Sequence, residues 1–468
     1  MSWETVIGFE IHTELLTESK VWCGCSTAFG QPPNTQVCPV CLGLPGSLPV
    51  LNRRALELAM RASLALGCRL APVTQFERKN YYYPDLPKNY QISQLRKNLA
   101  EGGAVEFDVD GRHVSVRINN IHLEEDAGKN LHPEIPGVDY SLVDLNRAGT
   151  PLLEIVTEPD LRSAEEARVF METLKAILEY TGVSDCNMHE GRLRFEANVS
   201  VRRKGDERLG TKVEIKNLNS MKTVLKCIEV ETERQIEILE EGGKVVQETR
   251  LWDEAAGVTR AMRSKEVAHD YRYFPDPDLV EIVIDNEWIE RVRAEIPELP
   301  DARRHRFVEQ FGLSEYDANV LTAAKPLADY FEAAVAAHNN PKALANWIQT
   351  ETLRWLGEDA DREMRDYPIA ATDLAELVRL IDVGTISGAI AKKVYRAMMD
   401  GEGSPEAIVK ARGLVQISDT SAIEPVIDEV IAKNPQSVED FRAGKERALG
   451  ALVGQVMKAT QGKANPQL

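Results

Sequence analysis

The chain has 468 residues, of which 43% are hydrophobic and 28% are charged. This length exceeds what one ordinary hydrophobic core supports, so we expect about three domains, and the composition excludes a disordered or fibrous protein. Asp and Glu outnumber Lys and Arg by 74 to 56, and the resulting net charge of −18 argues against a protein coated in nucleic acid.

The N-terminal segment has no basic stretch followed by an apolar run, and no segment offers about 18 consecutive apolar residues without charges. We therefore predict a cytoplasmic protein that does not cross a membrane. Four of the seven cysteines lie between Cys23 and Cys41, while Cys68, Cys186 and Cys227 stand alone. This distribution favours a metal site and free thiols over a disulfide framework.

Capping residues predict three helices in the first 290 residues. Asn52 is suited to cap a helix that begins at the next residue, and Ser220 is suited to cap a long helix that ends before Gly242. Ser163 and Glu166 form an S-x-x-E capping box for a helix that runs to about residue 180. Strand patterns lie between these helices, which predicts a mixed α and β region.

The rest of the chain, from about residue 291 onward, has an almost wholly helical pattern. Pro297 and Pro300 interrupt it at 298–306, and glycines and a proline interrupt it within 400–406. We predict three domains, over residues 1–292, 293–402 and 403–468.

Two closely spaced cysteine pairs, Cys23-x-Cys25 and Cys38-x-x-Cys41, form the first chemical signal. Four thiolates on two short turns suit one tetrahedral zinc ion, and such a site is closed and structural because all four ligands come from protein. The alternative is that the cysteines act as small buried apolar residues.

Several predicted strands place polar side chains on one face. In the strand 6–15, Glu10 and His12 project together, opposite Ile7, Phe9 and Ile11. The strand 192–202 has a buried side of Leu193, Phe195, Ala197, Val199 and Val201, and a polar side of Arg192, Arg194, Glu196, Asn198, Ser200 and Arg202. Two further segments, 114–129 and 244–253, present Glu124, Glu125 and Asp126, and Glu248 with Arg250.

Such polar faces have two interpretations. Each strand alone fits an antiparallel sheet with one face in water. Taken together, however, carboxylates with a histidine suit Mg²⁺ or Mn²⁺, and neighbouring Arg and Lys suit phosphate oxygens. This set would support phosphoryl transfer without a P-loop, and the chain has no P-loop motif.

Tyrosines gather in two segments, 76–94 and 269–279, together with Lys79 and Lys88. Aromatic rings and cations in loops are able to stack bases or bind ribose and phosphate. Core anchors with satisfied hydroxyls are an equal alternative.

Five long blocks resemble the B-subunit family of glutamyl/aspartyl-tRNA amidotransferases. They are VCPVCLGLPGSLPVLN (37–52), RKNYYYPDLPKNYQISQ (78–94), IHLEEDAGK (121–129), EIKNLNS (214–220) and RSKEVAHDYRYFPDPDL (263–279). The resemblance extends over the whole chain. It implies an α+β fold: an N-terminal cradle like that of glutamine synthetase and guanido kinases, with an antiparallel sheet and a zinc knuckle, then an all-α domain and a small helical, tRNA-binding tail.

The resemblance also implies roles for residues. The family's zinc knuckle matches Cys23, Cys25, Cys38 and Cys41. Its catalytic and Mg²⁺ or Mn²⁺-binding positions match Glu10, His12, Glu124, Glu125, Glu196 and Glu248, with Glu124 placed beside the ligands; Glu196 stands where relatives often have Asp. For the nucleotide we expect contacts from Lys79, Arg194, Asn198, Ser200, Arg202 and Arg250.

The implied activity is the ATP-dependent amidation of Glu-tRNA(Gln) or Asp-tRNA(Asn), in which this chain phosphorylates the side-chain carboxylate. The implied partners are the amidase (A) and small (C) subunits of the same enzyme, misacylated tRNA and a non-discriminating aminoacyl-tRNA synthetase. Two other hypotheses are a free-standing amide ligase, which needs no knuckle or helical tail, and a non-catalytic tRNA-binding adaptor, which needs no carboxylate strands.

Overall fold

The computed structural model describes residues 2–132, 140–218, 220–262, 271–359, 362–415, 420–460 and 464. It divides the chain into two compact units, Met1–Leu299 and Pro300–Leu468. The first is a mixed α and β unit and the second is helical, which agrees with the predicted α+β class. Each unit is described separately below, and the predicted division into three domains stays a prediction.

A ten-stranded sheet forms the centre of the first unit. Its strands run in the order β15 (Val258–Ala261), β14 (Thr249–Asp253), β13 (Val213–Lys216), β12 (Leu193–Arg203), β1 (Trp3–Glu14), β11 (Pro151–Thr157), β8 (Arg112–Glu125), β6 (Ala100–Glu101) and β2 (Arg69–Leu70), with β7 (Ala104–Val109) paired to β8. Neighbouring strands are antiparallel except β13 and β14, which are parallel.

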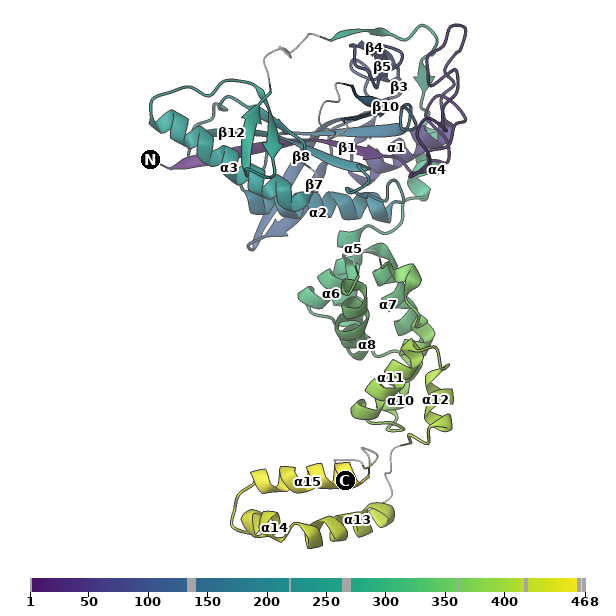
Figure 1. The fold of residues 1–468 in the computed structure, drawn as a ribbon, viewed down its shortest axis with the longest axis vertical. Helices are drawn as coiled ribbons and strands as arrows, with labels where there is room; N and C mark the ends of the chain where they lie inside the picture. The colour runs from purple at the N-terminus through teal and green to yellow at the C-terminus, as the bar shows by residue number, and fades with distance from the viewer. Residues whose placement is uncertain are drawn as a thin grey trace. The chain divides into compact units, whose positions relative to one another are not determined.

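Three helices cover the apolar side of this unit: α1 (Arg53–Ala65), α2 (Ala164–Tyr180) and α3 (Met221–Glu240). Figure 1 shows α2 and α3 along one face of the sheet. The predicted inward residues of β1 and β12 are all buried, and Phe9 stacks on Phe170 of α2 and meets Phe195 of β12 edge-on, both at 5.7 Å between ring centroids. The alternation read from the sequence therefore separates a helix-covered face from a polar face.

The predicted caps are present, with one difference. Asn52, Ser163 and Ser220 each accept backbone N–H bonds at the start of their helices. The Glu166 side chain, however, accepts from the backbone N–H of Arg162 (2.7 Å), one residue before the expected partner. The start of α2 is therefore held by two side-chain bonds, one made by Ser163 and one made by Glu166.

A small sheet of β16 (Arg272–Pro275), β4 (Glu77–Asn80) and β5 (Tyr90–Ser93) joins the two tyrosine-rich segments. Figure 1 shows β4 and β5 on the side of the large sheet opposite α2 and α3. The rings of Tyr81 and Tyr271 lie 5.5 Å apart, and the Lys79 ammonium lies 5.1 Å from the Tyr271 ring centroid. Residues 269 and 270 of the second segment lie outside the described residues.

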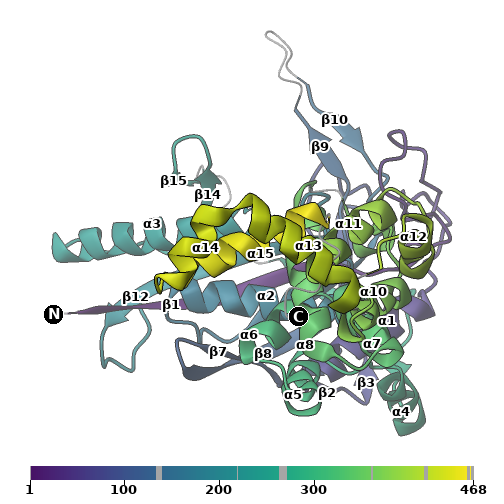
Figure 2. The same cartoon turned by 90° about the horizontal axis from the view of Figure 1, so that it is seen from below.

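Shorter elements complete the first unit. They are β3 (Val73–Thr74) paired with β17 (Ile282–Val283), β9 (Lys129–Leu131) paired with β10 (Leu142–Asp144), and α4 (Asn286–Ala294). Figure 2 shows β9 and β10 projecting from the body of the unit. The helix α4 packs on α1, where Trp288 donates to Glu57 (3.1 Å).

The second unit begins with a bundle around Phe307, Phe331 and Leu374. Its helices are α5 (Pro300–Phe311), α6 (Glu315–Thr322), α7 (Lys325–Ala337), α8 (Pro341–Trp347), the π-helix η1 (Ile348–Thr352), α9 (Leu353–Gly357), the 3-10 helix η2 (Met364–Asp366), α10 (Ala371–Asp382), α11 (Gly388–Met399) and α12 (Pro405–Ala411). Three more follow, α13 (Thr420–Lys433), α14 (Pro435–Arg442) and α15 (Arg447–Ala459).

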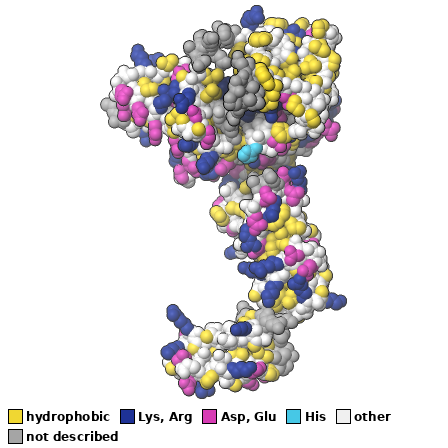
Figure 3. All heavy atoms as spheres, viewed as in Figure 1, with side chains coloured by type: hydrophobic (Ala, Val, Ile, Leu, Met, Phe, Trp, Pro, Cys, Tyr) yellow, Lys and Arg dark blue, Asp and Glu magenta, His cyan; other side chains and the backbone are white. Residues whose placement is uncertain are grey.

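The surface carries both signs of charge. On the visible face of the first unit, acidic and basic side chains are interspersed (Figure 3). Within the described ranges, no helix is both long enough and apolar enough to cross a membrane.

Candidate active site

A row of three side chains crosses the polar face of the large sheet. His12 of β1 lies opposite Glu154 of β11, which lies opposite His122 of β8. The His12 Nε2 atom is 3.4 Å from Glu154 Oε2, and His122 Nε2 is 2.9 Å from the same oxygen. Glu124, two residues beyond His122 and 2% exposed, lies 3.8 Å from each ring. Ligand atoms of His12, Glu124 and Glu154 lie within 4.8 Å of one another, close enough to hold one metal ion.

A second group on the same face is purely acidic. Glu10 of β1 lies opposite Glu196 of β12, and Glu214 of β13 lies opposite Asn198 of β12. Oxygens of the three carboxylates lie within 4.8 Å of one another. Asn198 Nδ2 donates to Glu10 (3.1 Å), so this amide holds one member of the group in place.

Cations surround the two groups. Lys216 is 3.1 Å from Glu196 and 3.4 Å from Glu214, and Arg194 is 2.8 Å from Asp126. Burial lowers the pKa of Lys79, but the charges of Glu124 and other neighbours outweigh it and raise the pKa overall. The site therefore combines anionic and cationic side chains, some buried and some partly buried.

Two carboxylates and one histidine of the site have shifted pKa values. Burial, followed by repulsion from neighbouring carboxylates, raises the pKa of Glu10. Burial also opposes ionisation of Glu154, but the two histidines outweigh it and hold the Glu154 pKa well below its usual range. Burial lowers the pKa of His12, yet the hydrogen bond and charge of Glu154 raise it overall to about 9. The pair of His12 and Glu154 therefore favours its ionised form, whereas Glu10 forms no ion pair with a cation among the described residues.

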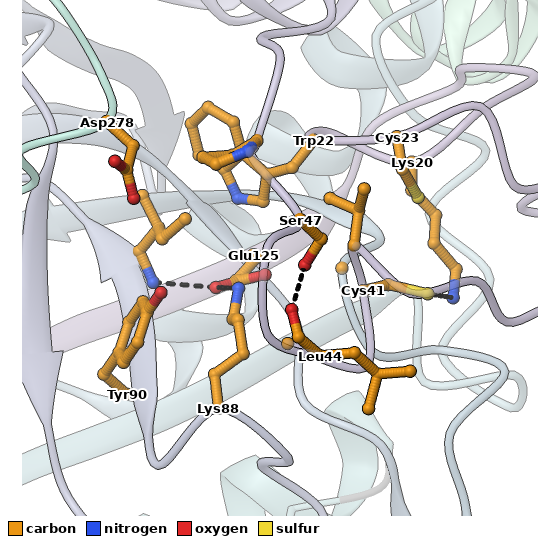
Figure 4. A pocket seen from close by; sticks show the side chains of 15 residues that line it. Lys20, Trp22, Cys23, Cys41, Leu44, Ser47, Lys88, Tyr90, Glu125 and Asp278 are labelled. Carbon is orange, nitrogen blue, oxygen red and sulfur yellow. Dashed lines mark hydrogen bonds and ion pairs between the residues drawn. The ribbon is translucent and has the colours of Figure 1, made fainter.

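Glu125 lies apart from both groups. It faces Pro151 in the register with β11, so its side chain leaves the sheet on the side opposite Glu124. It forms an ion pair with Lys88 and accepts from the backbone N–H of Ile92 (2.8 Å). Figure 4 shows Glu125 and Lys88 in a cavity of about 60 Å³ that Trp22 also lines.

The predicted strand 244–253 differs most from its prediction. It begins at Thr249, so Glu248 precedes it, and Glu248 pairs with Arg250. Arg250 lies opposite buried Ile215 and donates to Thr259 (2.8 Å), which places it on the helix-covered side. Residues 244–248 form no strand, and Arg250 lies on the helix-covered face rather than on a polar face shared with Glu248, as its sequence pattern had predicted.

The remaining predicted nucleotide contacts share the polar face of β12. Arg202 pairs with Glu4 at the outer end of the strand, and Ser200 is buried beside it. Arg194 and Asn198 lie nearer the acidic groups. Of the predicted residues, the structure therefore gathers Glu10, His12, Glu124, Glu196, Arg194, Asn198 and Lys79.

The predictions from sequence missed three members of the site: Glu154, His122 and Glu214. Glu154 is the one charged residue within β11, Pro151–Thr157, an otherwise apolar and Thr-containing strand. A single carboxylate in such a run was the available signal, because burial on both sides of a strand tolerates charge only with a partner. His122 and Glu214 lie in blocks already quoted for the family resemblance.

The four clustered cysteines meet at one point. Sulfurs of Cys23, Cys25, Cys38 and Cys41 lie within 4.8 Å of one another, and those of Cys38 and Cys41 are 3.9 Å apart. Tetrahedral Zn–S bonds of about 2.3 Å separate sulfurs by about 3.8 Å, so the donor set fits zinc. Buried Lys20 lies 3.6 Å from Cys41 Sγ. All seven cysteines lie among the described residues, and none forms a disulfide.

Comparison with known proteins places this geometry in a family. A model of the GatB/GatE catalytic domain matches residues 5–290, and a GatB domain model matches 329–468. The chain belongs to the GatB/GatE family. The family resemblance inferred from the sequence is thereby confirmed.

Individual GatB relatives are similar over nearly their whole length. The protein of Carboxydothermus hydrogenoformans is 57% identical over 466 residues, which cover 99% of this chain and 97% of the relative. That of Moorella thermoacetica is 58% identical over 468 residues, covering 100% and 98%. That of Geobacter sulfurreducens is 55% identical over 467 residues, covering 100% and 97%. All three are named as the B subunit of the aspartyl/glutamyl-tRNA(Asn/Gln) amidotransferase.

Proposed function

We propose that this GatB-family chain activates the side-chain carboxylate of glutamyl or aspartyl residues carried on tRNA, in the amidation for which its relatives are named. The observation that carries the proposal is the pair of adjoining side-chain groups on one sheet face, one His/Glu and one tri-carboxylate, each with ligand atoms close enough together to hold a metal ion. We propose ATP as the phosphoryl donor.

Activation is needed because a carboxylate is a poor acyl donor. Attack of one carboxylate oxygen on the γ-phosphorus of ATP forms a C–O–P linkage and releases ADP. Ammonia then adds to the carbonyl carbon, and phosphate leaves with the carboxylate oxygen. The chain has to bring two anionic substrates together, so it has to offset their negative charge.

The described residues suit these tasks. His12, Glu124 and Glu154 would hold one Mg²⁺ or Mn²⁺ ion, and Glu10, Glu196 and Glu214 would hold another. The positive charge that such ions supply would offset the charge of the two anionic substrates. Lys79, whose charge is favoured by Glu124, is suited to bind a phosphate oxygen. Asn198 orients Glu10.

For the fold we propose the cradle type of glutamine synthetase and guanido kinases, with a separate tail over 403–468 that binds tRNA. Support comes from the large, mainly antiparallel sheet with helices on one face and carboxylates on the other. We also propose a structural zinc ion at the four cysteines, and a cytoplasmic complex with the amidase (A) and small (C) subunits.

The proposal is tested by removing one carboxylate from each group. Glu10→Gln and Glu124→Gln are each compared with Glu106→Gln, a matched change at an exposed residue of β7. We expect both site variants to lose ATP-dependent amidation in the assembled complex, because each loses an ionised ligand without loss of shape. Full activity in both would overturn the proposal, while the Glu106 variant reports any general effect of the substitution.

A further inference from the structure

Lys20 precedes the cysteine loop, residues 23–41, and its side chain is fully buried, with 0% of its surface exposed. No other lysine among the described residues is buried, and no described carboxylate forms an ion pair with Lys20. Removing an ammonium from water is strongly unfavourable unless an anion offsets its charge. The anion beside Lys20 is therefore a group other than an Asp or Glu side chain.

The Lys20 ammonium has three contacts, one for each of its N–H donors. Its Nζ atom lies 2.8 Å from Gln36 O, 3.4 Å from Leu145 O and 3.6 Å from Cys41 Sγ. Figure 4 shows the Lys20 side chain directed at the Cys41 sulfur. The two carbonyl oxygens are neutral, so only the sulfur, as a thiolate, is able to supply a negative charge.

The cysteine group needs a cation for the same reason. Four thiolates and one Zn²⁺ ion leave a net charge of −2, and such charge is costly to bury unless donors and cations offset it. Cys41 Sγ accepts from the backbone N–H of Cys38 (3.1 Å). Lys20 is the one described cationic side chain within hydrogen-bond distance of any of the four sulfurs. The ammonium and the thiolates therefore offset each other's charge.

We propose that Lys20 is a positioning residue of the zinc site, whose ammonium donates to the Cys41 thiolate and offsets one of the two negative charges. This inference rests on the zinc ion proposed above and deepens it. The carbonyl oxygens of Gln36 and Leu145 hold the ammonium at the sulfur. Because Lys20 acts through its charge, its loss should weaken metal binding and change the electronic state of the thiolates. A lysine that only joined backbone segments would affect stability alone.

The spectrum of Co²⁺ bound in place of zinc tests this role in the whole 468-residue chain. A neighbouring cation stabilises the sulfur electrons, so the sulfur-to-cobalt charge-transfer band should move to longer wavelength in Lys20→Met. Lys20→Arg, which keeps the charge, should remain near the wild type. Zn²⁺ affinity should fall about tenfold or more in Lys20→Met. The control is Lys175→Met, the same change at a lysine of α2 that pairs with Glu179, which should alter neither the band nor the affinity.

A measurement on the wild type decides the question if Lys20→Met fails to fold. With ¹¹³Cd²⁺ in place of zinc, nuclear magnetic resonance should detect a coupling between the metal and the Lys20 ammonium protons through the N–H···S bond. Absence of that coupling, or an unchanged charge-transfer band in folded Lys20→Met, would overturn the role of Lys20.

Failure of this inference is distinguishable from failure of the proposed function. A wild type that binds none of these metals at its cysteines would remove both the zinc ion and the role of Lys20. Loss of amidation in Glu10→Gln and Glu124→Gln would still support the proposed activity, because those carboxylates lie outside the cysteine group.

Discussion

At the scale of single residues, two neighbouring glutamates show how position in a strand decides the face on which a side chain lies. Glu124 and Glu125 adjoin in sequence, and the family resemblance alone favoured Glu125 as the ligand. Because successive side chains leave a strand on opposite faces, only the register with β11 shows that Glu124 shares the face of Glu154. Glu10, His12 and Glu196 were predictable because their strands alternate cleanly; Glu154 was not, because its strand reads as apolar.

This difference between the two glutamates is testable. We expect Glu124→Gln to weaken Mn²⁺ binding about tenfold or more, since an ionised metal ligand becomes a neutral amide. Glu125→Gln should leave Mn²⁺ affinity unchanged, because its carboxylate pairs with Lys88 instead. Isothermal titration of both variants makes the comparison, and equal losses would place Glu125 in the metal group after all.

At the scale of elements, the starts of helices and the interiors of strands could be predicted from the local sequence, whereas irregular segments could not. The caps Asn52, Ser163 and Ser220 start helices where the sequence predicted them. The segment 244–248 has a strand-like composition but no strand; among the described residues, its last residue, Glu248, accepts a backbone N–H from Glu214 of β13 (3.1 Å), and no ladder extends before it. Pairing between distant segments is therefore what local sequence patterns could not predict.

Ser163 offers a test of the capping argument. Its hydroxyl accepts from Glu166 N (3.1 Å), and Ser163→Ala should lower the free energy of unfolding by about 1 kcal/mol. Ser163→Asp, which preserves a cap acceptor, should remain close to the wild type. Urea denaturation of both variants provides the measurement. An alanine variant as stable as the aspartate variant would refute the contribution of the cap.

The cysteine loop offers a second test at this scale. Residues 23–41 contain no helix and few buried apolar side chains, so we expect one bound zinc ion to hold the loop together. Cys41→Ser should lose zinc and lower the melting temperature. Cys186→Ser, a change at a buried cysteine outside the group, should retain zinc. Metal analysis of purified protein decides, and zinc retained by Cys41→Ser would contradict a four-thiolate site.

At the scale of the whole molecule, a net charge of −18 has to coexist with a tRNA substrate. The acidic groups of the site account for only a small part of this charge. The last 28 residues run against it, with five basic residues and one acidic residue. Arg442, Lys445, Arg447 and Lys458 are exposed there, while Lys463 lies outside the described residues. Sequence composition alone was sufficient to locate this local reversal of charge.

A less basic tail tests this distribution. The triple variant Arg442→Gln, Arg447→Gln and Lys458→Gln should bind tRNA more weakly at low salt. Its affinity should also depend less on salt, because each lost phosphate contact removes about 0.7 to 0.9 from the slope of log K against log salt. Filter binding across a salt series measures both effects. A slope equal to that of the wild type would place the tRNA contacts elsewhere.

The central claim is that this chain's site transfers a phosphoryl group to the carboxylate before ammonia arrives. Glutamyl-tRNA labelled with ¹⁸O in its side-chain carboxylate, supplied with ATP and ammonia to the assembled complex, tests it most directly. We predict that inorganic phosphate carries one ¹⁸O atom for each amide formed, and that Glu124→Gln yields none. Amide formation accompanied by unlabelled phosphate would contradict the claim.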